Sequence, residues 1–248
     1  MLRACPDGQY RFLPGIGAYS SGVVAAPGHQ LVHATLRAPR PYREGFALVE
    51  RHLEARGRPR AALCAVELRL PAPLSFEGFA RFNDGYRALL ADWKLLVDGH
   101  NPVARTNVAP LVRPPAEPSL HGFAYTVPGA TSRPTFVVAG AGDLRDGPMD
   151  PSGVVRPGEH TPDALREKAA FVMAVMQTRL RGLGADWADV TAIDVYTAQP
   201  VHAFLARTVL EPAGPAAAHG IHWFLSRPPI EDLDYEMDLR GTLEALVV

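Results

Sequence analysis

The stretch ARTNVAPLVRPP, residues 104–115, is nearly repeated later in the chain as AHGIHWFLSRPP, residues 218–229. Both stretches begin with Ala, place Leu at the same step and end in Arg-Pro-Pro. Recurrence of this kind indicates a duplicated chain, in which the two stretches form equivalent strands. The second position differs, with Arg105 in the first copy and His219 in the second, and this difference predicts that the copies have specialised.

Other elements recur in the same order. The segment HLEARGRPRAALCAVEL, residues 52–68, aligns with RLRGLGADWADVTAIDV, residues 179–195. In each, an amphipathic helix ends near a glycine, Gly57 or Gly184, and a strand rich in small and β-branched residues follows. The recurrence of a helix and strand supports a two-copy chain.

Hydrophobic periodicity locates the helices and strands. Apolar spacing predicts one helix over residues 76–90 and another in the second copy, which begins after Thr161 as N-cap with Pro162 in its first turn. Predicted strands cover 29–36 and 119–127 in the first copy, and 135–144 and 232–241 in the second.

This order of elements predicts an α+β fold. It consists of two tandem units, residues 1–128 and 129–248, and each unit is a mixed β-sheet with two helices packed on one face. The boundary between the copies is expected near the prolines at 128 and 134.

Composition restricts the classes of function. The chain has 248 residues, of which 47% are hydrophobic, and a net charge of −1 without a long run of Lys or Arg, which argues against nucleic acid as a partner. Apolar runs are too short for a membrane span, and no secretory signal is visible. Cys5 and Cys64 have no metal-ligand spacing and are expected to be free thiols of a cytoplasmic protein.

Three motifs resemble the RidA/YjgF family of reactive-intermediate deaminases. They are Ile-Gly-Ala-Tyr-Ser at 16–20, Asn-Asp-Gly-Tyr at 83–86 and Val-Ala-Arg-Thr-Asn-Val at 103–108. The resemblance implies a chorismate-mutase-like fold, a homo-oligomer that is most often a trimer, and sites in the clefts between copies. It also implies hydrolytic deamination of small imine or enamine carboxylates without a metal or cofactor.

The resemblance assigns substrate-binding residues to the first copy. Arg105 matches the family arginine that binds the substrate carboxylate, for which a planar guanidinium with two parallel donors is suited. Tyr19 matches a tyrosine that lines the family's cleft, and Asn107, in the same motif as Arg105, is a further substrate-binding candidate.

The acid of the family site is missing from the first copy. The family has a Glu on its last strand, whereas the first copy offers only His121, which could act as a base because its ordinary pKa is near neutrality. The second copy has Asp234 and Glu236 on its last strand. A composite site is therefore expected, with Arg105 of one copy facing Glu236 or Asp234 of the other.

The last strand, residues 232–241, alternates strictly between apolar and polar side chains. Its polar face carries Asp234, Glu236, Asp238 and Arg240. Solvation of this face is the alternative to a catalytic role, since alternating strands usually expose their polar side.

The second copy has a polar and aromatic cluster of its own. His219 is a candidate for anion binding when protonated, and Trp223 is a candidate for stacking on a conjugated ligand. His219 and His222 are three residues apart and point to opposite faces of an extended strand, so no shared metal site is expected.

Three functions therefore stay open. The first is a deaminase of small imine or enamine carboxylates. The second is a chorismatase-like lyase or hydrolase acting on a cyclic enol-ether acid, since the chorismatases join two such units in one chain. The third is a non-catalytic module that binds a small carboxylate.

Overall fold

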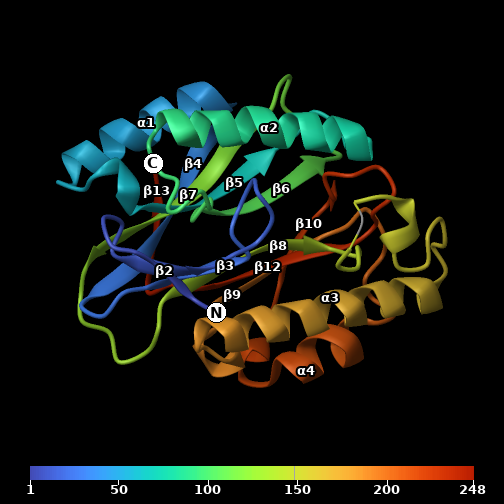
Figure 1. The fold of residues 1–248 in the computed structure, drawn as a ribbon. Coiled ribbons are helices and arrows are strands. Elements are labelled where there is room, and N and C mark those ends of the chain that lie inside the picture. Colours follow the sequence, from blue (N-terminus) through green and yellow to red (C-terminus); the bar gives the residue numbers. More distant parts are fainter. Residues whose placement is uncertain (148) are drawn as a thin grey trace.

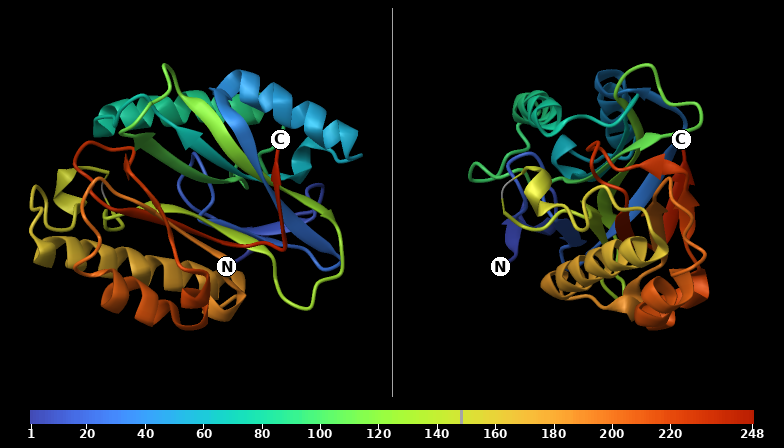
Figure 2. Two further views of the ribbon diagram at one scale, coloured as in Figure 1. Left: turned by 180° about the vertical axis from the view of Figure 1, so that it is seen from behind. Right: turned by 90° about the vertical axis from the view of Figure 1, so that its right-hand side faces the viewer.

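The computed structural model describes residues 1–147 and 149–248. Two β-sheets lie face to face, and helices cover the outer face of each sheet (Figure 1). Figure 2 shows the same layers from two further sides. The space between the two sheets therefore contains side chains from both.

The two sheets have seven and six strands. The seven-stranded sheet has the spatial order β1 (Arg3–Cys5), β2 (Tyr10–Leu13), β3 (Gly22–Ala25), β8 (Phe136–Gly142), β12 (Glu236–Gly241), β9 (Ala192–Tyr196) and β10 (His222–Phe224). The six-stranded sheet has the order β11 (Ser226–Arg227), β6 (Ala104–Pro110), β5 (Leu63–Arg69), β7 (Ser119–Pro128), β4 (His29–Pro41) and β13 (Glu244–Val247).

The helices pack on these sheets through their apolar faces. Helices α1 (Tyr42–Ala55) and α2 (Phe76–Asp92) cover the six-stranded sheet, and α3 (Pro162–Leu183) covers the seven-stranded sheet together with the short helix α4 (Glu211–Ala213) (Figure 1). The predicted caps of α3 are confirmed. Thr161 accepts a hydrogen bond from Ala164 N, and Gly184 ends the helix with a φ of 78°.

The expected fold of two tandem units, each with its own sheet and two helices, is wrong because the sheets exchange strands. The N-terminal strands β1, β2 and β3 join the seven-stranded sheet, where β3 pairs with β8. The C-terminal strand β13 joins the six-stranded sheet beside β4. Each sheet thus contains strands from both halves of the chain. The division into domains at 128 and 129 stays a prediction.

The tandem repeat is wrong for a further reason. The first stretch forms the single strand β6, but the second is divided between two sheets, with β10 parallel to β9 and β11 antiparallel to β6 itself. His219 lies in a 3-10 turn before β10 begins, so it is not at the strand position of Arg105.

The alternation of the last strand is confirmed, but its polar face is not solvated. Met237 and Leu239 pack in the core against α3, whereas Glu236, Asp238 and Arg240 point into the space between the sheets. Each of these three residues is at most 9% exposed. Three ionisable side chains on one buried strand face need partners in the opposite sheet.

Cys5 and Cys64 are buried free thiols, as expected. Among the described residues, no helix has the length and apolar character to cross a membrane. The homotrimer stays a prediction.

Candidate active site

A cavity of about 180 Å³ opens beside the end of β8. Its walls come from the loop before β3, from β6 and β12, and from α3. The residues that carry its chemistry are Tyr19, Arg105, Asn107, Gly140, Arg179 and Glu236. Because both sheets and the helix α3 contribute, residues distant in sequence meet at one small-molecule-sized space.

Arg105 stands on β6 and is 2% exposed. Aromatic rings surround its guanidinium carbon, with the ring centroids of Tyr19 and Tyr86 4.6 and 4.7 Å away. Its Nη2 donates to Asn83 Oδ1 at 2.6 Å, but Nε and Nη1 have no hydrogen-bond partner among the described residues. Burial lowers the pKa of Arg105 from its ordinary value. Unpaired buried donors are rare, and two on one guanidinium have the chemistry to bind an anion.

Asn107 lies two residues after Arg105 on β6. It is 3% exposed and lines the same cavity. Neither Oδ1 nor Nδ2 has a hydrogen-bond partner in the described part of the chain. An amide with a free donor and a free acceptor can bind a ligand that carries both an N–H group and an oxygen.

Arg179 reaches the cavity from α3. Its Nη1 donates to the carbonyl oxygens of Ala139 at 2.9 Å and Gly140 at 3.3 Å. These carbonyls lie on β8 just after Val138, the last residue of β8 that pairs with β3. The guanidinium of Arg179 therefore supplies the hydrogen-bond donors that a neighbouring strand would otherwise provide.

Glu236 is the buried acid of the cavity and is 4% exposed, whereas Asp146 is exposed at the rim. Burial raises its pKa to about 8, the nearby Asp238 carboxyl adds to the increase, and Arg179 and Arg105 oppose it. The carboxyl is therefore mostly protonated near neutral pH. A group with a pKa near the working pH can both donate and accept a proton during one reaction.

Gly140 provides the space that Glu236 occupies. A Cβ at this position would overlap Glu236 Oε1 and would press on Thr106. We predict that Gly140→Ala displaces the carboxyl and lowers catalytic activity roughly 10²-fold, because misplacement by about 1 Å has this effect in catalytic sites. Steady-state kinetics and a thermal melt test this. Gly85→Ala, in open space on α2, is the control, and full activity of Gly140→Ala would contradict the prediction.

The structure brings four of the expected site residues together, namely Tyr19, Arg105, Asn107 and Glu236. It places Asp234 elsewhere, because its carboxylate lies 3.0 Å from Lys168 Nζ and 3.1 Å from His160 Nε2. The functional roles of the four cavity residues stay predictions at this point.

The other three expected residues lie away from the cavity. His121 lies on β7 with its Nε2 4.0 Å from Glu67, and burial, with the charge of Arg69, lowers its pKa to about 4. His219 is exposed. Trp223 donates from Nε1 to Thr197 O at 3.1 Å, and its ring lies edge-on to His202.

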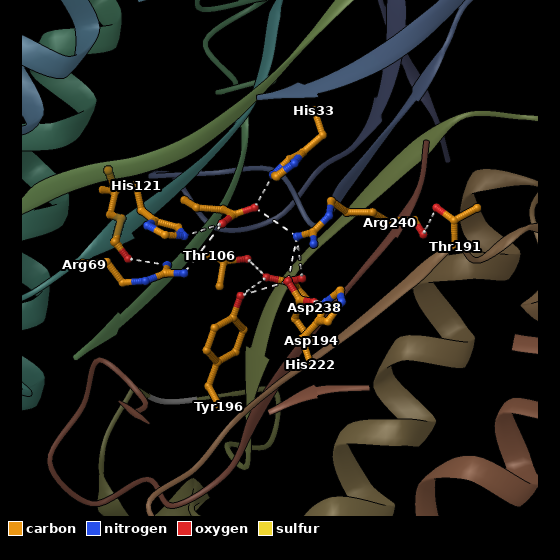
Figure 3. A network of polar contacts seen from close by, with 12 residues as sticks. His33, Arg69, Thr106, His121, Thr191, Asp194, Tyr196, His222, Asp238 and Arg240 are labelled. Atoms are coloured by element: carbon orange, nitrogen blue, oxygen red, sulfur yellow. Dashed lines mark hydrogen bonds and ion pairs between the residues drawn. The ribbon is translucent and has the colours of Figure 1, made fainter. Parts of the chain in front are cut away.

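The polar face of β12 continues into a network between the sheets, which we call the inter-sheet network (Figure 3). Its residues, joined by hydrogen bonds and ion pairs, are His33, Glu67, Arg69, Thr106, His121, Asp194, Tyr196, His222, Asp238 and Arg240. Arg240 Nη1 lies 3.0 Å from Glu67 Oε1 and 2.7 Å from Asp194 Oδ2, and it thereby joins the two sheets. Burial acts to raise the pKa of Glu67, but His33 and Arg240 hold it well below its usual range.

The inter-sheet network positions the cavity residues. Thr106, next to Arg105, donates to Asp238 Oδ2 at 2.6 Å, and Asp238 is two residues from Glu236 on the same strand face. This hydrogen bond fixes β6 against β12. Arg105 and Glu236, on these two strands, both line the cavity beside this hydrogen bond.

Sequence reasoning did not assign a role to Arg179. A signal was present, because Arg179 lies between Met176 and Leu180, which belong to the apolar face of α3. A charged residue within an apolar stripe must find polar partners, and here they are β8 carbonyls and the cavity. Among the described residues, no group of three or more His, Cys, Asp or Glu side chains is placed to hold a metal ion.

Comparison with known proteins identifies relatives along nearly the whole chain. A family model described as "2-aminomuconate deaminase CnbZ" matches residues 2–246. The 2-amino-5-chloromuconate deaminase of Comamonas testosteroni is 41% identical over 244 residues, which cover 97% of this chain and 96% of that protein.

Two solved structures are also similar. One is a chorismatase, with a TM-score of 0.47, 14% identity and coverage of 90% of this chain and 77% of the other. The second is a cyanuric acid hydrolase, with a TM-score of 0.43, 12% identity and coverage of 88% and 69%.

The expected membership of the RidA/YjgF family is wrong, because the family match and the 41% identical relative are of a different deaminase family. The three motifs that suggested it are short, and the first of them, at residues 16–20, lies in the loop before β3. The chorismate-mutase-like fold that these motifs implied is wrong as well, because the two sheets exchange strands.

Proposed function

The chain belongs to the 2-aminomuconate deaminase family, and on this premise we propose that it hydrolyses a 2-aminomuconate-type substrate to a 2-oxo acid, or its enol, and ammonia. One observation carries the proposal. Arg105, with two unpaired donors, and Glu236, a carboxyl that holds its proton near neutral pH, line the same cavity.

The chemistry suits these groups. An aminomuconate is an enamine, because its amino group is attached to a carbon–carbon double bond next to a carboxylate. Protonation of the carbon chain gives an iminium ion, water adds to the carbon that bears nitrogen, and the C–N bond breaks to release ammonia. Enamine and water are consumed, and oxo acid and ammonia are formed, without net oxidation.

Glu236 is suited to move the protons in these steps. Its acid form donates the proton to carbon, and the resulting carboxylate accepts a proton from the attacking water. It then returns this proton to the leaving nitrogen and takes back the one released as the carbonyl forms. A carboxyl with a pKa of about 8 can alternate between these states near neutral pH.

The other cavity residues are suited to bind and orient the substrate. Arg105 is suited to the carboxylate beside the amino carbon, since its free Nε and Nη1 donors can bind both oxygens. Asn107 offers Oδ1 to the substrate N–H and Nδ2 to an oxygen. Tyr19 packs on the guanidinium of Arg105 and holds it in place.

Ammonia release from 2-aminomuconate tests the proposal. We expect turnover by the purified protein, and we expect Arg105→Gln to lower kcat/KM about 10²-fold, because charge-assisted hydrogen bonds to the carboxylate are lost. Arg51→Gln, at an exposed site on α1, is the matched control. Imines formed in situ from amino acids and a cyclic enol-ether acid are assayed in parallel. Turnover of either of these, with none of aminomuconate, would overturn the proposal.

A further inference from the structure

The cavity contains a second guanidinium, that of Arg179, which makes no ion pair with the described residues, although the carboxyl groups of Glu236 and Asp146 act on it from further away. Among the described residues, no carboxylate forms an ion pair with Arg105 or Arg179, whereas Lys168 and Arg240 each lie within 3.0 Å of two carboxylates. At the exposed rim, Arg145 and Asp146 have opposite charges. With Glu236 mostly protonated, the interior of the cavity carries two positive charges.

The two arginines enter the cavity from different layers of the fold. Arg105 stands on β6 beneath α2, whereas Arg179 belongs to α3, on the opposite outer side of the molecule (Figure 1). They therefore contact a ligand from separate walls. Two guanidinium groups on separate walls fit two separate anionic groups of one ligand better than a single carboxylate.

The hydrogen bonds of Arg179 leave part of its guanidinium free. Nη1 is held by the carbonyl oxygens of Ala139 and Gly140, which fixes the side chain against the wall of the cavity. Its Nε and Nη2 make no hydrogen bond to the described residues. A guanidinium that is anchored through one nitrogen and free at the others is preorganised to bind a carboxylate.

We propose that Arg179 binds the second carboxylate of the substrate, the one remote from the amino carbon, and so makes the cavity selective for linear dicarboxylates. This inference rests on the proposed function for the orientation of the substrate, with the amino end at Arg105 and Asn107. The selectivity itself follows from charge, because a monocarboxylate leaves one buried guanidinium uncompensated.

Binding of two stable ligands tests the inference without turnover. trans,trans-Muconate and sorbate share one conjugated carbon chain, but sorbate has a methyl group in place of the second carboxylate. We expect calorimetry to show that the full-length protein binds muconate about 10²-fold more tightly than sorbate, the difference that a charge-assisted pair supplies.

Variants assign the difference to Arg179. Arg179→Gln should weaken muconate about 10²-fold and change sorbate less than about threefold, so that the selectivity disappears. Arg179→Lys, which keeps the charge, should retain part of it. Arg181→Gln, at an exposed site two residues further along α3 and outside the cavity lining, is the matched control and should behave as the wild type. A thermal melt of each variant verifies that it is folded.

The outcomes separate the inference from the proposed function. Equal weakening of both ligands by Arg179→Gln would mean that Arg179 only supports the edge of β8, and would overturn the inference. Equal binding of both ligands by the wild type would also overturn it. Muconate selectivity that depends on Arg179, in a protein that releases no ammonia from aminomuconate, would leave the dicarboxylate site standing and remove the deaminase.

Discussion

Glu236→Gln is expected to lower deaminase activity about 10²–10⁴-fold, the contribution of a positioned general acid and base. The amide has the shape of the carboxyl but can neither donate an acidic proton to carbon nor take one from water. In the wild type, kcat/KM should fall as the pH rises through about 8, because the acid form of Glu236 is then lost. This pH dependence should be absent from the residual activity of the variant.

The same substitution is expected to raise stability near neutral pH. The pKa of Glu236 is about 8 in the folded protein and 4.5 ordinarily, so between these values the unfolded chain has lost a proton that the folded chain keeps. The free energy of unfolding of the wild type therefore decreases as the pH rises through this window. The glutamine side chain of the variant does not titrate, so the variant is spared this loss.

Melting temperatures measured from about pH 4 to pH 8 test both parts of this prediction. The variant should melt above the wild type at the upper end, and the difference should vanish at the lower end. Glu231→Gln, at an exposed site five residues earlier, is the control. An active Glu236→Gln enzyme would exclude Glu236 as the acid, and lower stability near neutral pH would exclude the raised pKa.

The local elements of this fold could be predicted from sequence, because short-range rules decide them. Thr161 and Gly184 limit α3 as expected, and Ser75 caps α2, which begins at Phe76. The alternation of the last strand also gave the correct side-chain faces, since a strand has a period of two. These features depend on neighbours within a few residues.

The sheet assignments could not be predicted in the same way. β13 pairs with β4 and β3 pairs with β8, and both pairings join segments more than a hundred residues apart. Alternation shows that one face of a strand is polar, but it does not show whether solvent or a second sheet covers that face. Solvent exposure of the polar face of β12 was therefore an open interpretation. The composite site with Arg105 and Glu236 in one cavity was expected from the sequence. The place of Arg179 in this cavity could be seen only in the structure, because its carbonyl partners lie on another element, β8.

Lys168→Met is expected to cause the largest loss of stability, about 3–5 kcal/mol, which is the effect of removing one partner from a buried ion pair. Lys168 is fully buried, and its Nζ lies 2.8 Å from Asp143 Oδ2 and 3.0 Å from Asp234 Oδ2. Met fills similar space, but it leaves two carboxylates without their cation. Burial already raises the pKa of Asp143 from its ordinary value, although Lys168 opposes this.

This cluster matters for the cavity because Asp143 Oδ1 accepts the backbone N–H groups of Asp234 and Tyr235, immediately before Glu236. Urea unfolding near neutral pH measures the loss, with Lys94→Met, the other lysine of the sequence and an exposed one, as the control. Asp143→Asn added to Lys168→Met should recover part of the loss, since the amide oxygen can still accept those N–H groups while one uncompensated charge is removed. A Lys168→Met protein as stable as the wild type would mean that the two carboxylates bind protons at little cost, and that the ion pair does not hold the end of β8 against β12.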